Sequence, residues 1–136
     1  MAVTYEIRSI MSQDIVTVDA KDSLSVAVRI MVKKEIGSVV ATQDGEMVGI
    51  LTERDVLKKF SFDAAGSSAR VEEVMSSPLI TVEGRSAIGK AADLMAEKRV
   101  RRLLVTLEGS IRGIVTERDI MRATLYVFKT LADAAL

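Results

Sequence analysis

Short apolar runs and helical apolar stripes alternate along the chain in a fixed order. Residues 15–18 form a β-branched run and predict a short strand. Residues 24–31 then carry apolar side chains at i, i+3, i+4 and i+7, which predicts a helix with one buried face. Two further apolar runs, 38–42 and 47–51, have the length of buried strands, and a second helix is expected from Thr52. The first half of the chain is therefore predicted to fold as β-α-β-β-α.

The second half of the chain repeats this pattern. Residues 11–58 align with residues 75–122 without a gap, and 15 of the 48 pairs are identical, where composition alone gives roughly three. The longest identical run is Thr-Glu-Arg-Asp, at residues 52–55 and 116–119. Because a unit of about 50 residues buries too little surface to be stable alone, the two repeats are expected to pack as one body.

Turn and cap residues fit the same repeat. Each pair of apolar runs is joined by a residue pair that ends in glycine, which accepts the positive φ of a tight hairpin. Asp22 or Ser23 is expected to cap the first helix, and Ser86 its counterpart. The hairpin pairs are Asp44-Gly45 and Glu108-Gly109.

These patterns predict an α+β fold in which two βαββα repeats, related by pseudo-two-fold symmetry, pack sheet to sheet. We expect repeat 1 with an N-terminal segment at 1–60, a linker at 61–70 and repeat 2 with a helical extension at 71–136, all in one intertwined module. Gly66-Ser67-Ser68 predicts a flexible linker. Leu125, Phe128 and Leu131 have helical spacing, so the last segment either extends the final helix over the core or contacts another subunit.

Composition narrows the chemistry. The chain has no cysteine and no histidine, which removes thiolate chemistry, the commonest general base and the commonest metal ligand. Lys+Arg and Asp+Glu both total 19, so no net charge favours nucleic acid or a membrane. No secretory signal and no membrane-length apolar run is visible. We expect a cytoplasmic, non-catalytic protein without a metal or a cofactor.

A tandem repeat in which the copies end in Gly-Ile-Leu-Thr-Glu-Arg-Asp and Gly-Ile-Val-Thr-Glu-Arg-Asp resembles the CBS (cystathionine β-synthase) domain family. The likeness covers residues 8–123, and the short motif gains its specificity from occurring twice at a fixed offset. The resemblance implies a regulatory, energy-sensing module for signal transduction. It also implies a homodimer and an adenine nucleotide (AMP, ADP or ATP, with S-adenosylmethionine less favoured) bound in one or two clefts between the repeats.

The resemblance also implies the site residues. In the family, the Asp that ends one repeat holds the ribose hydroxyls, the nearby Thr contacts ribose or phosphate, and two segments of the other repeat enclose the adenine. Carried over to this sequence, cleft 1 combines Val16, Thr17, Ile36, Gly37, Thr116, Arg118 and Asp119. Cleft 2 combines Thr52, Arg54, Asp55, Ile80, Thr81, Val100 and Arg101.

The chemistry of these residue types suits a nucleotide. A carboxylate accepts hydrogen bonds from both hydroxyls of a ribose, and a helix N-terminus and an arginine fork suit phosphate. Only repeat 2 has a basic cluster near its second strand, with Arg99 and Arg102 beside Arg101 as further phosphate contacts. The equivalent positions of repeat 1 are Glu35, Gly37 and Ser38, so we expect the two clefts to differ.

Other interpretations of the same residues remain open. Thr52 and Asp55 have the spacing of a helix capping box, and so do Thr116 and Asp119. The basic cluster of repeat 2 also suits a solvent-exposed face with no ligand. The alternative functions are a protein-interaction scaffold or a nucleic-acid-binding module with vestigial clefts, and an enzyme is a third. The regulated partner is unknown, and contacts with membrane or nucleic acid are not expected.

Overall fold

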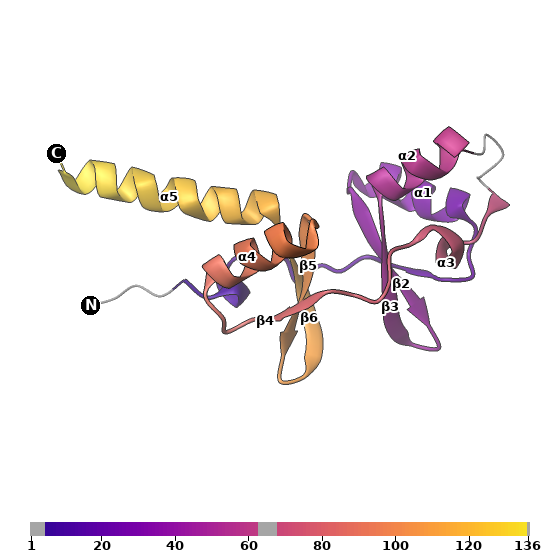
Figure 1. The fold of residues 1–136 in the computed structure, drawn as a ribbon, viewed down its shortest axis with the longest axis horizontal. Coiled ribbons are helices and arrows are strands. Elements are labelled where there is room, and N and C mark those ends of the chain that lie inside the picture. The colour runs from indigo at the N-terminus through magenta and orange to yellow at the C-terminus, as the bar shows by residue number, and fades with distance from the viewer. Residues whose placement is uncertain (1–4, 63–67, 136) are drawn as a thin grey trace. The chain divides into compact units, whose positions relative to one another are not determined.

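The chain contains two three-stranded sheets, each flanked by helices, in a computed structural model that describes residues 5–62 and 68–135 (Figure 1). Contacts divide these residues into two units. Unit 1 takes its described residues from 5–14 and 80–135, and unit 2 from 15–62 and 68–79. The α+β class and the two βαββα halves predicted from the sequence are confirmed.

Unit 2 contains repeat 1. Strand β1 runs parallel to β2, and β2 pairs antiparallel with β3. The hairpin between β2 and β3 has φ of 52° at Asp44 and 81° at Gly45, so the predicted glycine turn is confirmed. The elements are β1 (Thr17–Asp19), α1 (Leu24–Lys34), β2 (Ser38–Gln43), β3 (Glu46–Thr52), α2 (Glu53–Phe62) and the short α3 (Val71–Val74).

Unit 1 contains repeat 2 and has the same topology. Strand β4 is parallel to β5, and β5 is antiparallel to β6, with φ of 53° at Glu108 and 80° at Gly109 in the hairpin. The elements are a 3-10 helix η1 (Ile7–Ser9), β4 (Thr81–Glu83), α4 (Ile88–Lys98), β5 (Arg102–Leu107), β6 (Ser110–Thr116) and α5 (Glu117–Ala135).

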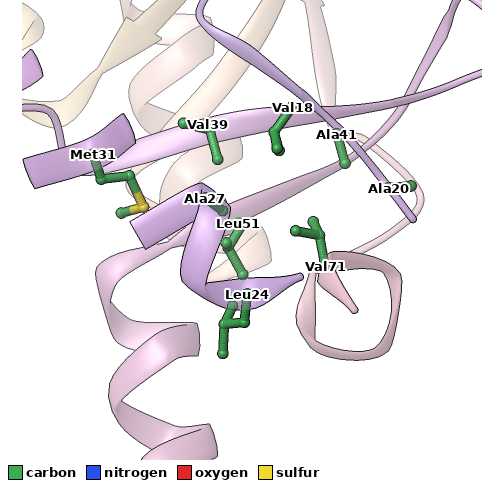
Figure 2. Close-up of a cluster of buried hydrophobic side chains, with 9 residues drawn as sticks. All are labelled: Val18, Ala20, Leu24, Ala27, Met31, Val39, Ala41, Leu51 and Val71. Carbon is green, nitrogen blue, oxygen red and sulfur yellow. The ribbon is translucent and has the colours of Figure 1, made fainter. Parts of the chain in front are cut away.

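Each unit has its own apolar core between the sheet and one helix. In unit 2 the buried face of α1 packs with sheet residues, and Val71 of α3 joins them (Figure 2). Met31 and its counterpart Met95 are both buried, as the helical stripe predicts. Full burial of a Leu or Val side chain stabilises a fold by about 1.5–3 kcal/mol. The unit 2 core is Val18, Ala20, Leu24, Ala27, Met31, Val39, Ala41, Leu51 and Val71.

The segment that precedes each repeat packs against the other repeat. In unit 1 the N–H of Ile7 donates to the carbonyl of Ser86 (2.9 Å). In unit 2 the N–H of Val71 donates in the same way to the carbonyl of Asp22 (2.9 Å). We call residues 5–12 and 69–76 the lead-in segments. Equivalent residues of the two segments lie 64 positions apart, which is the offset of the sequence repeat. The structural repeat therefore begins before residue 11, where the sequence alignment starts.

Each lead-in segment ends by pairing with the last strand of the sheet that it joins. The backbone of Ser12 exchanges two hydrogen bonds with Ile114 (2.8 and 2.9 Å), and Ser76 does the same with Ile50 (2.9 and 3.0 Å). These pairs cover sheet edges that would otherwise expose unpaired N–H and C=O groups.

Glycine is required where the lead-in segments cross the sheets. A Cβ built on Gly49 would lie 2.5 Å from Met75 Sδ and 3.0 Å from the carbonyl oxygen of Ser76. On Gly113 it would lie 2.5 Å from Met11 Sδ and 2.8 Å from the carbonyl oxygen of Ser12. The identical pairs Met11/Met75 and Gly49/Gly113 thus form one packing contact, made once in each unit.

Three local predictions differ from the structure. The first strand is Thr17–Asp19 rather than 15–18, although the carbonyl of Val16 still accepts a hydrogen bond from the N–H of Val40 in β2 (2.9 Å). Ser86 does not cap α4, whose N-cap is Ala87, and the hydroxyl of Ser23, the N-cap of α1, shares a hydrogen bond with Ser25 instead. The backbone leading into these helices is held by the lead-in segments, with the N–H of Ile88 bound to the carbonyl of Tyr5 (3.1 Å).

The last segment of the chain extends the final helix, as predicted, but does not pack over the core. The final helix does continue, to Ala135, but Leu125, Phe128 and Leu131 are exposed rather than packed over the core. At the predicted linker, Ser61 belongs to α2 and Arg70 pairs with Ser23, whereas Gly66 and Ser67 lie outside the described residues.

Candidate functional site

The predicted site residues of each repeat gather at one end of its sheet. In unit 2, β1 and β2 are parallel, so Thr17 and Gly37 lie at the end where both strands begin. Because β3 runs antiparallel to β2, it ends there too, at Thr52. The N–H of Glu53 donates to the carbonyl of Gly37 (3.0 Å), which fixes the start of α2 beside the start of β2.

Exposure varies among these residues. Thr17 and Arg54 are exposed, and the others are partly buried, so all seven have surface available to a ligand. The seven residues of unit 2 are Val16, Thr17, Ile36, Gly37, Thr52, Arg54 and Asp55.

Thr52 and Asp55 form the capping box that their spacing predicts. The N–H of Asp55 donates to Thr52 Oγ1 (3.2 Å), and the N–H of Thr52 donates to Asp55 Oδ2 (3.0 Å). The Thr52 hydroxyl also donates to Oδ2 (3.0 Å). A carboxylate in the first turn also complements the helix dipole. The carboxylate of Asp55 accepts both of its hydrogen bonds through Oδ2. Its other oxygen, Oδ1, therefore has no partner within residues 5–62 and 68–135.

Unit 1 repeats this arrangement. The N–H of Asp119 donates to Thr116 Oγ1 (3.2 Å), and the N–H of Thr116 donates to Asp119 Oδ2 (2.9 Å). The N–H of Glu117 donates to the carbonyl of Arg101 (2.9 Å). Thr81 and Arg118 are exposed, while Ile80 and Val100 are partly buried beside the sheet. Capping and ligand binding are therefore chemically compatible in both repeats, because capping occupies a single oxygen of each aspartate.

The basic cluster of repeat 2 lies at the same end of the unit 1 sheet. Arg99 follows α4 with φ of 56°, Arg101 is exposed, and Arg102 begins β5 partly buried. Arg101 forms an ion pair with Glu117 at 3.8 Å, but both side chains are mostly exposed, so water screens this pair and it holds the guanidinium weakly. The cluster can therefore offer its guanidinium groups to an anion.

A groove of about 470 Å³ beside Asp119 was not predicted from the sequence. It brings residues of the lead-in segment, including Tyr5, against the first turns of α5, where Arg122 and Tyr126 follow Asp119 at helical spacing. That spacing was a signal in the sequence for α5, whereas nothing local indicated Tyr5. The groove adds aromatic and cationic side chains around one of the two capping aspartates.

Unit 2 has a more apolar groove of about 500 Å³ between the end of α1 and the start of α2. It includes the predicted residue Ile36 and the acidic Glu35. The described residues contain no group of three or more acidic side chains placed to hold a metal ion. Nor does any helix in residues 5–62 and 68–135 combine the length and apolar character needed to cross a membrane.

Each predicted cleft takes residues from both units. The structure brings the members from one unit together at a sheet end, in each unit. The combination of the two sets into cleft 1 and cleft 2 stays a prediction.

Similarity to known sequences agrees with the duplicated site. The CBS domain family model matches residues 7–61 and again 71–126, so each match ends shortly after a Thr-Glu-Arg-Asp run. An uncharacterized protein of Methanopyrus kandleri is 39% identical over 101 residues, covering 72% of this chain and 52% of that protein. Hypoxic response protein 1 of Mycobacterium tuberculosis is 31% identical, covering 85% and 82%.

Several relatives are longer than this chain. The chain spans 52%, 42% and 31% of the length of three archaeal relatives that it matches. It also matches 24% of an inosine-5'-monophosphate dehydrogenase of Nitrosopumilus maritimus, at 30% identity. The similarity to that enzyme therefore concerns a minor part of it.

Solved structures show the same fold. A CBS-domain protein of Agrobacterium tumefaciens has a TM-score of 0.82 at 27% identity, with 88% of this chain and 92% of that chain covered. The CBS domain pair of protein MJ0100, solved with 5'-methylthioadenosine and S-adenosyl-L-methionine, has a TM-score of 0.79 at 26% identity, covering 93% and 99%. With both repeats matched by the family model and the fold shared with CBS pairs, this chain belongs to the CBS domain family.

Proposed function

We propose that the chain is a regulatory module that binds an adenosine-containing nucleotide between its repeats and passes its occupancy to a partner protein. The observation that carries the proposal is the duplicated capping box, which leaves Oδ1 of Asp55 and of Asp119 without a partner among the described residues. An unpaired carboxylate oxygen at a sheet end suits a ribose hydroxyl, which needs an acceptor. The adenosine ligands of the MJ0100 pair support this ligand class.

The two clefts are proposed as the sequence resemblance assigns them. Asp119 acts in cleft 1 with Thr116 and Arg118, and the adenine lies against Val16 and Ile36. The remaining partners there are Thr17 and Gly37. Cleft 2 is the counterpart, with Asp55, Thr52 and Arg54 facing Ile80, Thr81, Val100 and Arg101.

The basic cluster distinguishes the two clefts. Arg101 belongs to cleft 2, and Arg99 and Arg102 stand beside it, whereas cleft 1 has Gly37 at the matching position. Charge-assisted bonds from arginine to phosphate are stronger than neutral ones. We therefore propose that cleft 2 takes the ligand with more phosphates, ADP or ATP, and that cleft 1 takes AMP or an uncharged adenosine derivative such as 5'-methylthioadenosine.

The mode of action is proposed to be non-catalytic. Neither histidine nor cysteine is present to supply a general base or a thiolate nucleophile. A bound ligand then acts by favouring one arrangement of the repeats over another. The size of this shift is set by the difference in the ligand's affinity for the two arrangements. A cytoplasmic homodimer that contacts a separate regulated protein is the proposed working form.

Isothermal titration calorimetry with AMP, ADP, ATP, NADH, 5'-methylthioadenosine and S-adenosylmethionine tests the proposal. We expect saturable binding of at least one ligand. Asp55→Asn and Asp119→Asn should each weaken one binding event by about 10-fold or more, because an amide keeps a single acceptor for the cap and loses the charge. Asp133→Asn, on the exposed end of α5, is the matched control and should bind as the wild type does.

No heat from any of these ligands at millimolar concentration would refute the proposal. If binding occurs but neither aspartate variant changes it, the residue assignment is wrong although the ligand class stands. A salt-dependent mobility shift with RNA or DNA in the absence of nucleotide binding would favour the vestigial-cleft alternative instead.

A further inference from the structure

The groove beside Asp119 contains side chains that the two proposed clefts do not use. Its volume of about 470 Å³ falls in the range of small-molecule sites, and all of its lining residues belong to unit 1. Tyr5, Arg122 and Tyr126 are exposed there. Among residues 5–62 and 68–135, no hydrogen bond or ion pair engages these three side chains. Two aromatic rings and a guanidinium group are therefore open to a ligand.

The α5 residues of the groove lie on one side of the helix. Asp119, Arg122 and Tyr126 follow each other at intervals of three and four residues, which places them in a row. A rise of about 1.5 Å per residue puts Tyr126 about 10 Å along α5 from Asp119. Because Asp119 is the proposed ribose acceptor of cleft 1, the row leads from that ribose into the groove.

The chemistry of the row matches the successive parts of a dinucleotide. The free carboxylate oxygen of Asp119 suits a ribose hydroxyl. Arg122 suits a phosphate, and Arg118 of cleft 1 lies one turn before it on the same side of α5. Since a pyrophosphate has two anionic phosphates, each arginine can hold one of them. The tyrosine rings offer faces on which a second base can stack.

The tyrosine rings favour one kind of second base. The face of an aromatic ring is negative, so it attracts a cationic ring more strongly than a neutral one. The oxidised nicotinamide ring carries a positive charge, whereas adenine and dihydronicotinamide carry none. Tyr5 is 36% exposed and Tyr126 is 65% exposed, so a stacked ring would cover surface that now faces water.

We infer that the groove beside Asp119 is a subsite for the nicotinamide half of NAD⁺, whose AMP half occupies cleft 1. Arg122 binds the pyrophosphate, and Tyr5 and Tyr126 bind the cationic ring. The inference rests on the proposed function and names the ligand of cleft 1 more closely, as a dinucleotide with a cationic second base.

Repeat 1 lacks two of the side chains that would make a second subsite of this kind. At the offset of 64 residues, Ala69 stands in place of Tyr5, and Glu73 stands in place of Ser9. An alanine has no ring for stacking, and a negative charge would repel a pyrophosphate. We therefore expect the dinucleotide in cleft 1 and not in cleft 2.

Tyrosine fluorescence tests the inference directly. The chain has two tyrosines and no tryptophan, and both tyrosines line this groove. The intrinsic fluorescence of the whole protein therefore reports on the subsite alone. Saturating NAD⁺ should quench most of that fluorescence after correction for ligand absorbance, because a stacked cationic ring accepts an electron from an excited phenol. AMP at the same concentration should not quench it.

Calorimetry on the full chain gives the matching affinities. NAD⁺ should bind about 10-fold more tightly than AMP, the effect of one stacked base, and about 3-fold more tightly than NADH, whose ring is neutral. Tyr126→Ala should bring the ratio of the NAD⁺ and AMP affinities close to one. Phe128→Ala is the matched control and should keep that ratio, because Phe128 is an exposed ring of α5 outside the groove lining. Thermal melts should be unchanged in both variants, since both rings are mostly exposed.

The failure of this inference is distinct from the failure of the proposed function. AMP binding without tighter binding of NAD⁺ would overturn the inference and leave the proposed function standing. NAD⁺ that binds without quenching the tyrosines, or that binds equally well to Asp119→Asn, lies elsewhere and would also overturn it. The proposed function fails on another result, the absence of binding by every adenosine ligand tested.

Discussion

The two halves of this chain share a backbone and differ in what they present to solvent. Glu35 and Arg99 end equivalent helices with φ of 54° and 56°, and the hairpins after β2 and β5 have nearly the same φ values. The lead-in contacts and the capping boxes also recur with nearly the same lengths. Several identical pairs hold this backbone, among them Gly49/Gly113 and Thr52/Thr116, whereas the charge at the sheet ends differs.

The differences that matter for a ligand lie in the charge at the sheet ends and in the lining of the grooves. Where unit 1 has Arg99 and Arg101, unit 2 has Glu35 and Gly37, so one sheet end is cationic and the other is not. The groove of unit 2 is lined by Val28 and Val32, whose counterparts in unit 1 are alanines. Duplication therefore kept two copies of one scaffold and gave each a surface of its own, which is the physical basis for expecting two unequal clefts.

The largest expected effect tests whether the two scaffolds are equivalent. Gly49→Ala and Gly113→Ala should each destabilise the chain by about 2 kcal/mol in urea denaturation, because the new methyl meets a methionine sulfur and a backbone carbonyl. Gly113→Ala should cost more, since its carbonyl contact would be 2.8 Å rather than 3.0 Å.

Gly89→Ala is the control for these variants. Gly89 lies in α4, where an added methyl group would meet open space, so alanine there should stabilise the helix by about 0.5–1 kcal/mol. If Gly49→Ala were neutral while Gly113→Ala was costly, the lead-in contact would matter in only one unit, and the equivalence of the scaffolds would be lost.

The next effect concerns the difference in charge. Arg101→Ala should weaken ATP binding by about 10-fold and leave AMP binding nearly unchanged, because it removes one charge-assisted phosphate contact. Its effect on stability should stay below about 0.5 kcal/mol, since the ion pair with Glu117 is exposed. Calorimetry on the variant and a melting curve separate the two roles. Equal losses for AMP and ATP would show that the cluster does not distinguish phosphates.

The smallest effect compares the two helix ends. Glu35→Gly and Arg99→Gly should each stabilise the chain by about 0.5–1 kcal/mol, because glycine adopts positive φ without a Cβ clash. Glu35→Gly should gain more, since it also removes an acidic group from a helix C-terminus, where the dipole disfavours it. Denaturation midpoints measure both, and a larger gain for Arg99→Gly would contradict the dipole effect.

Most of the fold could be predicted from the sequence because its signals are local. The hairpin glycines, the Met31 and Met95 stripes and the Thr-x-x-Asp boxes each act within a few residues, and all three predictions are confirmed. The exchanged lead-in segments were missed, because a contact such as Ser12 with Ile114 joins residues far apart in the chain. The identity of Met11 and Met75 was visible in the sequence, but only the structure shows that both pack on a glycine.

The candidate site also combines features that have a local signal in the sequence with features that depend on distant residues. Its residues within one repeat follow from the element order, since parallel and antiparallel strands bring their ends together. The groove with Tyr5 depends on the exchanged segment and so had no local signal. The serine caps failed for a related reason, because the helix starts are held by lead-in backbone rather than by their own side chains.

A crystal structure of the chain with the tightest-binding adenine nucleotide tests the central claim most directly. We predict a ribose whose hydroxyls lie within hydrogen-bond distance of the free carboxylate oxygen of Asp55 or Asp119, while the other oxygen still caps its helix. A nucleotide bound elsewhere, or a ribose held without either aspartate, would contradict that claim.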